Sequence, residues 1–309
     1  MVLLKQTACP LKADGVSSQP SLNAILGSVD VTREHACAKL NLGLAVRGRR
    51  PDGMHRIHTV FASTDFCDEL LVSVRPKGIE LLVSGAVAVP EGEENLVWRA
   101  AALYLEAAGT EGGVQIRLVK QIPTGAGLGG GSADAAALLR ALARLYPAEL
   151  DLPALALRLG ADVPFLLRGG LAEARGVGEQ LRYLQPLQAH FVLVKPPFEV
   201  PTAAAYAALE ERDYGPELDV AAILKALQQG AVPPWRNDLE RAVFFAYPPL
   251  ADLKELLENY GLAGVLMSGS GSTLFAPLAS RGKAEQYANA LARRYPGFAT
   301  RAVSLAVAG

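Results

Sequence analysis

The sequence predicts a protein of two domains, each of which mixes helices with strands. A chain of 309 residues exceeds what one compact core usually holds. Alternating apolar residues indicate a strand over 36–46. A second alternating segment at 114–118 leads through a glycine-rich loop into an alanine-rich helical pattern that runs to about Tyr146. The C-terminal part ends in the order helix, strand, strand, helix, strand, which is typical of a split βαβ module.

We place the first domain at 34–185 and the second at 186–309, and we expect 1–33 to be a loose extension. Apolar residues in the extension show no sustained period, and proline, glycine and serine interrupt every candidate element. The run at 2–4 is too short for the core of a secretory signal. The near absence of arginine argues against an organellar transit peptide.

Composition indicates a soluble enzyme that binds neither nucleic acid nor membranes. Hydrophobic residues make up 50% of the chain and charged residues 20%, which excludes bulk disorder. The formal net charge of −1 leaves no basic footprint for nucleic acid or an anionic membrane. No apolar run approaches the roughly 20 residues of a membrane span. Cys9, Cys37 and Cys67 are odd in number and widely spaced, so we expect reduced thiols in a cytoplasmic protein.

The glycine-rich loop is the strongest functional signal. Five glycines occur in the seven residues 125–131, and a loop without side chains lets backbone N–H groups at a helix start approach a phosphate chain. A turn that only allows close packing needs fewer glycines. The loop matches G-x-G-x-x-G, but the second strand and acidic residue of a dinucleotide site do not follow, nor does the Gly-Lys of a Walker A loop. We therefore expect a nucleoside triphosphate held by a loop of another kind.

The first strand presents an unusual polar face. Lys39, Asn41 and Gly43 project from one side, while the alternate residues are apolar. On spacing alone, a solvated edge lysine and a functional lysine are equally good interpretations. The segment that follows, 49–55, has the composition of a tight turn. It ends in His55, which is either a ligand contact or an ordinary surface histidine.

Asp162 lies in a short glycine-flanked segment after a helix expected at 152–159. Its carboxylate could cap the next helix, which Pro164 would begin. Alternatively, it could be a positioned general base. Asp151, by contrast, is expected only to cap the helix at 152–159.

The remaining elements follow from the same periodicities. The loop at 268–272 contains only serine and glycine, and it could be a second anion-contacting loop. Strands are expected at 191–194, 263–267, 273–276 and 299–307, and helices at 202–211, 220–228, 250–260 and 281–295.

Together these segments resemble the GHMP kinase superfamily over nearly all of 35–305. The glycine loop alone indicates the superfamily. The Lys39 and Asp162 segments and the turn before His55 resemble the branch that phosphorylates 4-diphosphocytidyl-2-C-methyl-D-erythritol. The resemblance is carried by 38–42, 49–55, 94–96, 123–136, 160–164, 176–179, 237–240 and 267–271.

The resemblance implies an α+β fold of two domains, a ribosomal-protein-S5-like N-terminal domain and a ferredoxin-like (split βαβ) C-terminal domain, with nucleotide and substrate in the cleft between them. It also implies transfer of the ATP γ-phosphoryl group to the 2-hydroxyl of the methylerythritol unit, in the non-mevalonate route to isoprenoid precursors. ATP would act with Mg²⁺, although no carboxylate cluster marks a dedicated metal site. The partners would be ATP and the small-molecule substrate, and the chain would be a monomer or weak homodimer.

By motif position, Asp162 corresponds to the catalytic base and Lys39 to its partner. An ammonium group beside a carboxylate favours the ionised form and can stabilise charge on a transferred phosphoryl group. Asn41 would help to hold substrate, and His55 corresponds to the residue that reads the cytosine edge. The further substrate positions are Met54, Thr202 and Tyr206, and the ATP-binding positions are Asn95, Lys120, Pro123, Gly125, Gly127, Leu128, Gly129, Gly130, Gly131, Ser132 and Ala133.

One position departs from the family pattern. An aromatic residue usually precedes the histidine and stacks on cytosine, whereas this chain has Met54. A thioether can lie against a base, but it holds the base less rigidly than a ring does. This leaves Tyr206 as the stacking ring on one side.

Two other functions share part of these features. Another GHMP kinase, acting on homoserine, mevalonate or a sugar, would have the glycine loop, but the turn with Pro51, Asp52, Gly53 and His55 argues against it. A catalytically inactive nucleotide-binding sensor would keep the loop without a need for the lysine and aspartate that are both present here.

Overall fold

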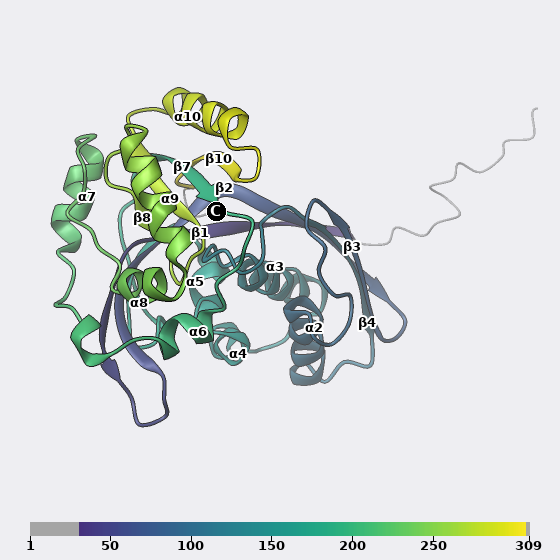
Figure 1. Cartoon of the computed structure of the whole chain (residues 1–309). Helices are drawn as coiled ribbons and strands as arrows, with labels where there is room; N and C mark the ends of the chain where they lie inside the picture. Colours follow the sequence, from purple (N-terminus) through teal and green to yellow (C-terminus); the bar gives the residue numbers. More distant parts are fainter. Residues whose placement is uncertain (1–30, 307–309) are drawn as a thin grey trace, which may run out of the picture. The chain divides into compact units, whose positions relative to one another are not determined.

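A computed structural model describes residues 31–306 (Figure 1). The expected extension therefore lies outside the described residues, apart from 31–33, which begin strand β1 (Val31–Arg49). β1 starts earlier than the apolar alternation at 36–46. Most of its first residues are exposed, and an exposed strand end needs no apolar pattern.

The N-terminal sheet is built on one long antiparallel hairpin of β1 and β2 (His55–Arg75). The turn between them is tight, as expected. The N–H of Arg50 donates to the carbonyl of Met54 at 2.7 Å, and Asp52 Oδ1 accepts from the Met54 N–H at 3.0 Å. The sheet has the order β3-β4-β2-β5-β6, and β1 also pairs with β2. Its other strands are β3 (Ile79–Gly85), β4 (Gly113–Lys120), β5 (Leu171–Arg175) and β6 (Gln180–Tyr183).

The helices of this part are α2 (Leu96–Ala107), α3 (Gly130–Leu145), α4 (Leu152–Leu159) and α5 (Val163–Arg168). α3 packs against β1, β2, α2 and α5 (Figure 1). Its buried face is rich in alanine, and these small side chains let the helix approach its neighbours closely. α4 has the predicted bounds, and Asp151 caps it by accepting from the Ala154 N–H.

The C-terminal sheet has the order β10-β7-β9-β8 with every neighbouring pair antiparallel. This is the expected split βαβ arrangement. The strands are β7 (His190–Lys195), β8 (Leu266–Met267), β9 (Leu274–Leu278) and β10 (Ala299–Ser304). The helices are α6 (Thr202–Ala207), the 3₁₀ helix η1 (Glu211–Asp213), α7 (Val220–Gln228), α8 (Leu239–Ala246), α9 (Pro248–Asn259) and α10 (Arg281–Arg294).

Three helices differ from expectation, and the first is α2, where no helix was expected. The single helix predicted at 202–211 ends at Ala207, because Glu210 is extended and its N–H donates to Asp213 in a capping box that starts η1. α8 was missed, since its apolar residues at 242–246 are consecutive rather than spaced at a helical period.

The expectation of reduced cysteines is wrong for two of the three. Cys37 and Cys67 form a disulfide. The register of β1 and β2 places these two residues directly opposite each other, so residues 30 apart in sequence become neighbours. Cys9 lies outside the described residues.

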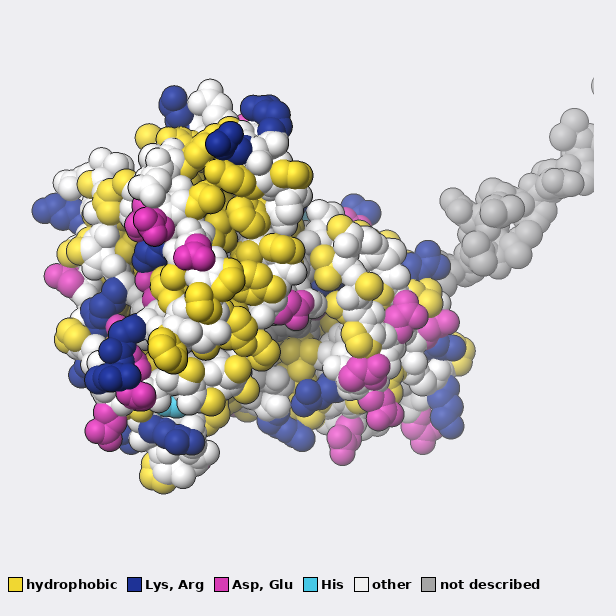
Figure 2. Space-filling view, viewed as in Figure 1, with side chains coloured by type: hydrophobic (Ala, Val, Ile, Leu, Met, Phe, Trp, Pro, Cys, Tyr) yellow, Lys and Arg dark blue, Asp and Glu magenta, His cyan; other side chains and the backbone are white. Residues whose placement is uncertain are grey.

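Among residues 31–306, none of the helices is both long and apolar enough to span a bilayer. Figure 2 shows basic and acidic side chains interspersed over one face of the described residues, in keeping with the net charge of −1. The two sheets share part of their core. One buried cluster combines Leu40 and Leu42 of β1 with Phe191 of β7 and Phe275 of β9.

Candidate active site

A cavity of about 950 Å³ lies where β1, the glycine-rich loop, the start of α5 and α6 meet. Both parts of the chain contribute to it, because the loop at 268–272 and helix α6 line it together with the N-terminal elements. The sequence-predicted residues in its wall are Lys39, Asn41, Met54, His55, Pro123, Gly125, Gly127, Gly129, Gly130, Gly131, Ser132, Asp162, Thr202 and Tyr206.

The glycine loop has a backbone that side chains would not allow. Gly125, Gly127 and Gly129 have φ values of 55°, 70° and 68°, in the left-handed region that favours glycine. A Cβ on Gly127 would lie 1.9 Å from the backbone oxygen of Ser268. Gly129 is the N-cap of α3 and provides no capping side chain, so the first N–H groups of the helix remain available to an anion.

The serine-glycine loop packs directly on the glycine loop. The Ser268 hydroxyl donates to the carbonyl of Gly127 at 2.9 Å. Gly269 and Ser270 line the cavity, and the Ser270 hydroxyl lies 3.0 Å from that of Thr202. The loop therefore faces the same space as the start of α3, as a second anion-contacting loop would.

Lys39 and Asp162 come together in the cavity wall. Lys39 Nζ lies 3.4 Å from Asp162 Oδ2 and donates to Asn41 Oδ1 at 2.6 Å. Asn41 in turn donates to the Thr59 hydroxyl at 2.8 Å, which fixes the orientation of its amide. The lysine side chain is 5% exposed and the aspartate side chain 32%. The ammonium group is thus held inside the wall, while the carboxylate faces the cavity.

The alternative role of Asp162 as a helix cap is not what the structure shows. Asp162 occupies the N-cap position of α5, but its side chain makes no capping hydrogen bond. Asp151, at the same position of α4, does make one. The Asp162 carboxylate is directed instead to Lys39.

An aromatic pocket made by His55, Tyr206 and Tyr214 forms part of the cavity. The His55 ring lies 5.3 Å from the Tyr206 ring and 6.1 Å from the Tyr214 ring, with Tyr214 edge-on. Burial lowers the pKa of His55, and the positive charge of Arg49 lowers it further. Burial raises the pKa of Tyr206, with a smaller contribution from the negative charge of Asp162. Both rings are therefore neutral at neutral pH.

Four predicted ATP-binding residues are not in the cavity wall. The Asn95 side chain caps α2 by accepting from the Val97 N–H, and Leu128 and Ala133 are buried. Lys120 is buried in ion pairs with Asp68 and Asp134. Sequence reasoning placed these residues by motif position, which does not reveal the direction of a side chain.

Lys120 lies directly behind the glycine loop. Its Nζ would be 3.0 Å from a Cβ on Gly130. Burial raises the pKa of Asp134, and the charge of Asp68 raises it as well. The positive charge of Lys120, 2.8 Å away, acts in the opposite direction and favours the ionised carboxylate.

Sequence reasoning also missed Tyr214, which lines the cavity. Tyr214 directly follows η1 in a segment without periodicity, and no local signal in the sequence distinguishes it from other surface tyrosines.

Comparisons with known proteins identify the family. The profile of the GHMP kinases N terminal domain matches residues 95–170, and that of the GHMP kinases C terminal region matches 206–297. The chain belongs to the GHMP kinase family. The two-domain α+β fold expected for such a kinase is confirmed by these matches.

This GHMP kinase is 51% identical over 256 residues to a 4-diphosphocytidyl-2-C-methyl-D-erythritol kinase of Thermus thermophilus, covering 83% of this chain and 91% of the relative. It is 46% identical over 270 residues to the protein of the same name from Deinococcus radiodurans, covering 85% and 89%.

Among solved structures, a 4-(cytidine 5'-diphospho)-2C-methyl-D-erythritol kinase superposes with a TM-score of 0.80 at 48% identity, covering 90% of this chain and 100% of that chain. A homoserine kinase from Cytophaga hutchinsonii superposes with a TM-score of 0.68 at 22% identity, covering 91% and 96%, and shares the fold.

Gly131 offers a direct test of phosphate binding by the loop. It is the second residue of α3, it lines the cavity, and a Cβ there would meet no protein atom within 4 Å. We expect Gly131→Val to leave the fold intact but to weaken ATP binding about 10- to 100-fold, which corresponds to one lost hydrogen bond to a charged group. Isothermal titration with ATP measures the effect.

Gly282→Val is the matched control, because Gly282 is the second residue of α10 and a Cβ there also meets no protein atom within 4 Å. Equal ATP affinity in the two folded variants would contradict phosphate binding at this loop.

Proposed function

We propose that this kinase transfers the γ-phosphoryl group of ATP to the 2-hydroxyl of 4-diphosphocytidyl-2-C-methyl-D-erythritol, in the non-mevalonate route to isoprenoid precursors. The proposal rests chiefly on 51% identity over most of the chain to a kinase of that name. The geometry supports it, because the Lys39–Asp162 pair lies in one cavity with the glycine loop and the aromatic pocket of His55.

In the proposed reaction, the glycine loop binds the ATP phosphates and Asp162 accepts the proton of the 2-hydroxyl as its oxygen attacks the γ-phosphorus. The bond from the γ-phosphorus to the bridging oxygen breaks, and ADP leaves. Lys39 stabilises the negative charge on the transferred group. Asn41, held by its bonds to Lys39 and Thr59, would contact the sugar-like part of the substrate.

ATP use follows from the family, and we propose Mg²⁺ as the accompanying ion. The described residues contain no group of three His, Cys, Asp or Glu side chains placed to hold a metal. That is compatible with Mg²⁺, which is often bound by one or two protein oxygens together with substrate phosphates. Asp162 and Ser132 are oxygen donors in the cavity wall. When bound, the ion would neutralise phosphate charge.

We further propose a cytoplasmic protein that acts as a monomer or weak homodimer, with ATP and the cytidylylated alcohol as its partners. The domain boundaries at 34–185 and 186–309 are also part of this proposal.

A phosphorylation assay on a panel of acceptors tests the function. The panel is 4-diphosphocytidyl-2-C-methyl-D-erythritol, methylerythritol phosphate, mevalonate and homoserine. We expect ADP release with the first acceptor only. Faster turnover of mevalonate or homoserine would favour another GHMP kinase, and ATP binding without turnover of any acceptor would favour a sensor.

His55→Ala is expected to raise KM for the cytidylylated substrate far more than KM for ATP, because the His55 ring lies among the aromatic rings of Tyr206 and Tyr214. Steady-state kinetics with each substrate varied in turn measures the ratio. An equal rise in both constants would remove His55 from the cytidine pocket.

The pH dependence of KM for the cytidylylated substrate follows from the lowered pKa of His55. A lowered pKa means that the ring takes up its proton only below the usual value of about 6.5. KM for the cytidylylated substrate should therefore stay level from pH 8 to about 6.5 and rise only at lower pH. A rise that begins above pH 6.5 would contradict this prediction.

Met54→Tyr is expected to lower KM for the cytidylylated substrate. Met54 lines the cavity and is 49% exposed, so a ring has room to lie against the base. Stacking of a ring on a base contributes about 1–3 kcal/mol. Met54→Gln is the control without a ring, and an equal effect of both substitutions would argue against stacking at this position.

A further inference from the structure

The segment 214–218 lies between η1 and α7, and its first residue, Tyr214, belongs to the wall of the aromatic pocket. Tyr214 lines the cavity, and its ring stands edge-on to His55 at an interplanar angle of 70°. Met54, the residue directly before His55, is half exposed and has no ring. Tyr214 is therefore a rigid surface that a nucleobase lying against His55 can contact.

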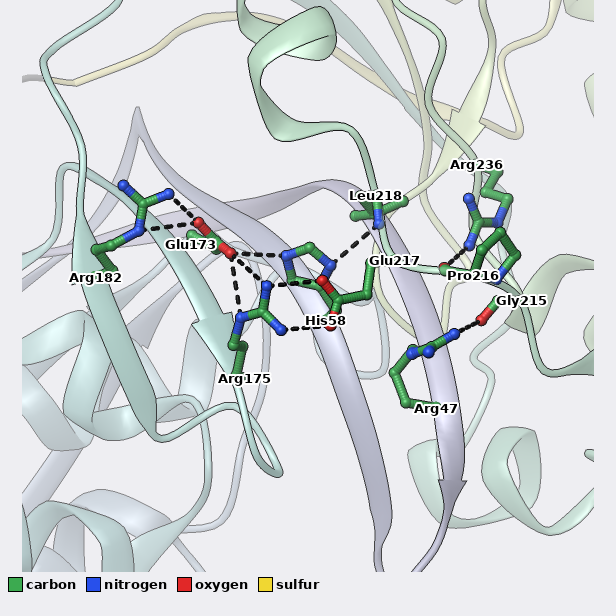
Figure 3. Close-up of polar contacts among 10 residues, drawn as sticks. All are labelled: Arg47, His58, Glu173, Arg175, Arg182, Gly215, Pro216, Glu217, Leu218 and Arg236. Atoms are coloured by element: carbon green, nitrogen blue, oxygen red, sulfur yellow. Dashed lines mark hydrogen bonds and ion pairs between the residues drawn. The ribbon is translucent and has the colours of Figure 1, made fainter.

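The start of the segment is held by Asp238. Oδ2 of Asp238 accepts from the N–H of Gly215 at 2.9 Å and from the N–H of Val46 at 2.9 Å. One buried carboxylate oxygen thus joins the residue after Tyr214 to β1. Oδ1 of Asp238 pairs with Arg236 Nε at 2.8 Å. In Figure 3, Arg47 donates to the carbonyl of Gly215, and Arg236 donates to the carbonyl of Pro216.

The end of the segment is held by His58 (Figure 3). The N–H of Leu218 donates to His58 Nδ1 at 3.1 Å. Because Nδ1 accepts, the ring proton is on Nε2, which lies 2.9 Å from Glu173 Oε1. Arg182 and Arg175 pair with Glu173, and Arg175 also pairs with Glu217 of the segment. Both ends of 214–218 are thereby fixed to the N-terminal sheet.

We propose that Tyr214 is a specificity-determining residue for the nucleobase and that Asp238 is the positioning residue that holds it against His55. This inference rests on the proposed function. A ring that is already fixed before the ligand arrives loses little conformational freedom on binding. The residue that fixes the ring therefore contributes to affinity, in addition to the contact that the ring itself makes. Without Asp238, the N–H of Gly215 loses its acceptor, and the bond from Arg47 to the Gly215 carbonyl is left to tie this end of the segment to β1.

A double-mutant cycle tests the proposal. Tyr214→Ala should raise KM for the cytidylylated substrate about fivefold or more, the lower end of a ring–base contact, and far more than it changes kcat or KM for ATP. Asp238→Ala should act in the same direction. If Asp238 acts through Tyr214, the double variant should be no worse than Tyr214→Ala alone. Effects that multiply, or an equal rise in KM for ATP, would overturn the proposal.

Conservative variants separate positioning from general stability. Asp238→Asn keeps an oxygen that can accept from both N–H groups and should restore most of the substrate affinity lost in Asp238→Ala. Tyr214→Phe keeps the ring and should lose less than Tyr214→Ala. If Asp238→Ala does not fold, Arg47→Gln provides the test, since Arg47 is exposed and donates to the Gly215 carbonyl. It should raise the same KM, whereas an unchanged KM would overturn the proposal.

Arg212→Gln is the matched control, because Arg212 is an exposed arginine in η1 that pairs with Glu210 and not with the segment. Titration of the wild type and variants with CDP separates this inference from the proposed function. Absence of CDP binding and of turnover in the wild type would overturn the function. Normal wild-type turnover with unchanged CDP affinity in Tyr214→Ala would overturn only the role of Tyr214.

Discussion

Replacing Asp162 with asparagine is expected to lower kcat by about 10²–10⁴-fold, the usual contribution of a general base. Asparagine keeps the size of the side chain and much of its hydrogen bonding, but it cannot accept the proton of the attacking hydroxyl. Both substrates should still bind, because the glycine loop and the aromatic pocket are untouched. Rapid-quench measurement of the single turnover, with separate binding titrations, distinguishes the chemical step from binding.

Asp151→Asn is the matched control for this prediction. Both aspartates occupy helix N-cap positions, and only Asp151 uses its side chain as a cap. Asparagine caps helices about as well as aspartate, so Asp151→Asn should keep both activity and stability. If Asp162→Asn also turned over at nearly the wild-type rate, Asp162 would not be the base.

Lys39→Met should lower kcat by about 10²–10³-fold, the usual loss when one charge-stabilising donor is removed. Methionine has a similar length, but it removes the ammonium group that lies 3.4 Å from Asp162 and that would face the transferred phosphoryl group. Folding should survive, because the Asp162 side chain is one-third exposed and water can solvate it. Steady-state kinetics and thermal unfolding of the same preparation check both statements.

Combining Lys39→Met with Asp162→Asn in one protein tests whether the two residues act as a unit. Residues that act as a unit give strongly non-additive losses, so the double variant should be little worse than the worse single variant. Lys254→Met, which removes a lysine paired with Glu240 away from the cavity, is the control for loss of a charge. A double variant whose loss equals the product of the two single losses would mean that Lys39 and Asp162 act independently.

Local patterns predicted much of the fold. The helices at 152–159 and 220–228 have the predicted bounds, and the split βαβ order is present, because period and capping residues are short-range properties. They failed where the local pattern was ambiguous. The helix expected at 202–211 is divided by a capping box, and the consecutive apolar residues of α8 concealed a short helix.

The candidate site was predictable as a set of residues but not as an arrangement. The sequence placed Lys39 and Asn41 on one strand face and indicated a phosphate loop at 125–131. It could not show that Lys120 is absent from the cavity wall and buried in ion pairs with Asp68 and Asp134. Side-chain direction depends on which distant carboxylates lie nearby, and motif position does not contain that information.

By itself, then, the sequence determined the class of elements, the glycine-rich loop that we expect to bind phosphate, and the resemblance to a kinase family, since each depends on residues close together in the chain. Only the tertiary structure decided that Asp162 faces Lys39 instead of capping α5. It also paired Cys37 with Cys67 and brought Tyr214 to His55. Each of these is a contact between residues far apart in sequence, and such contacts are set by strand register and packing.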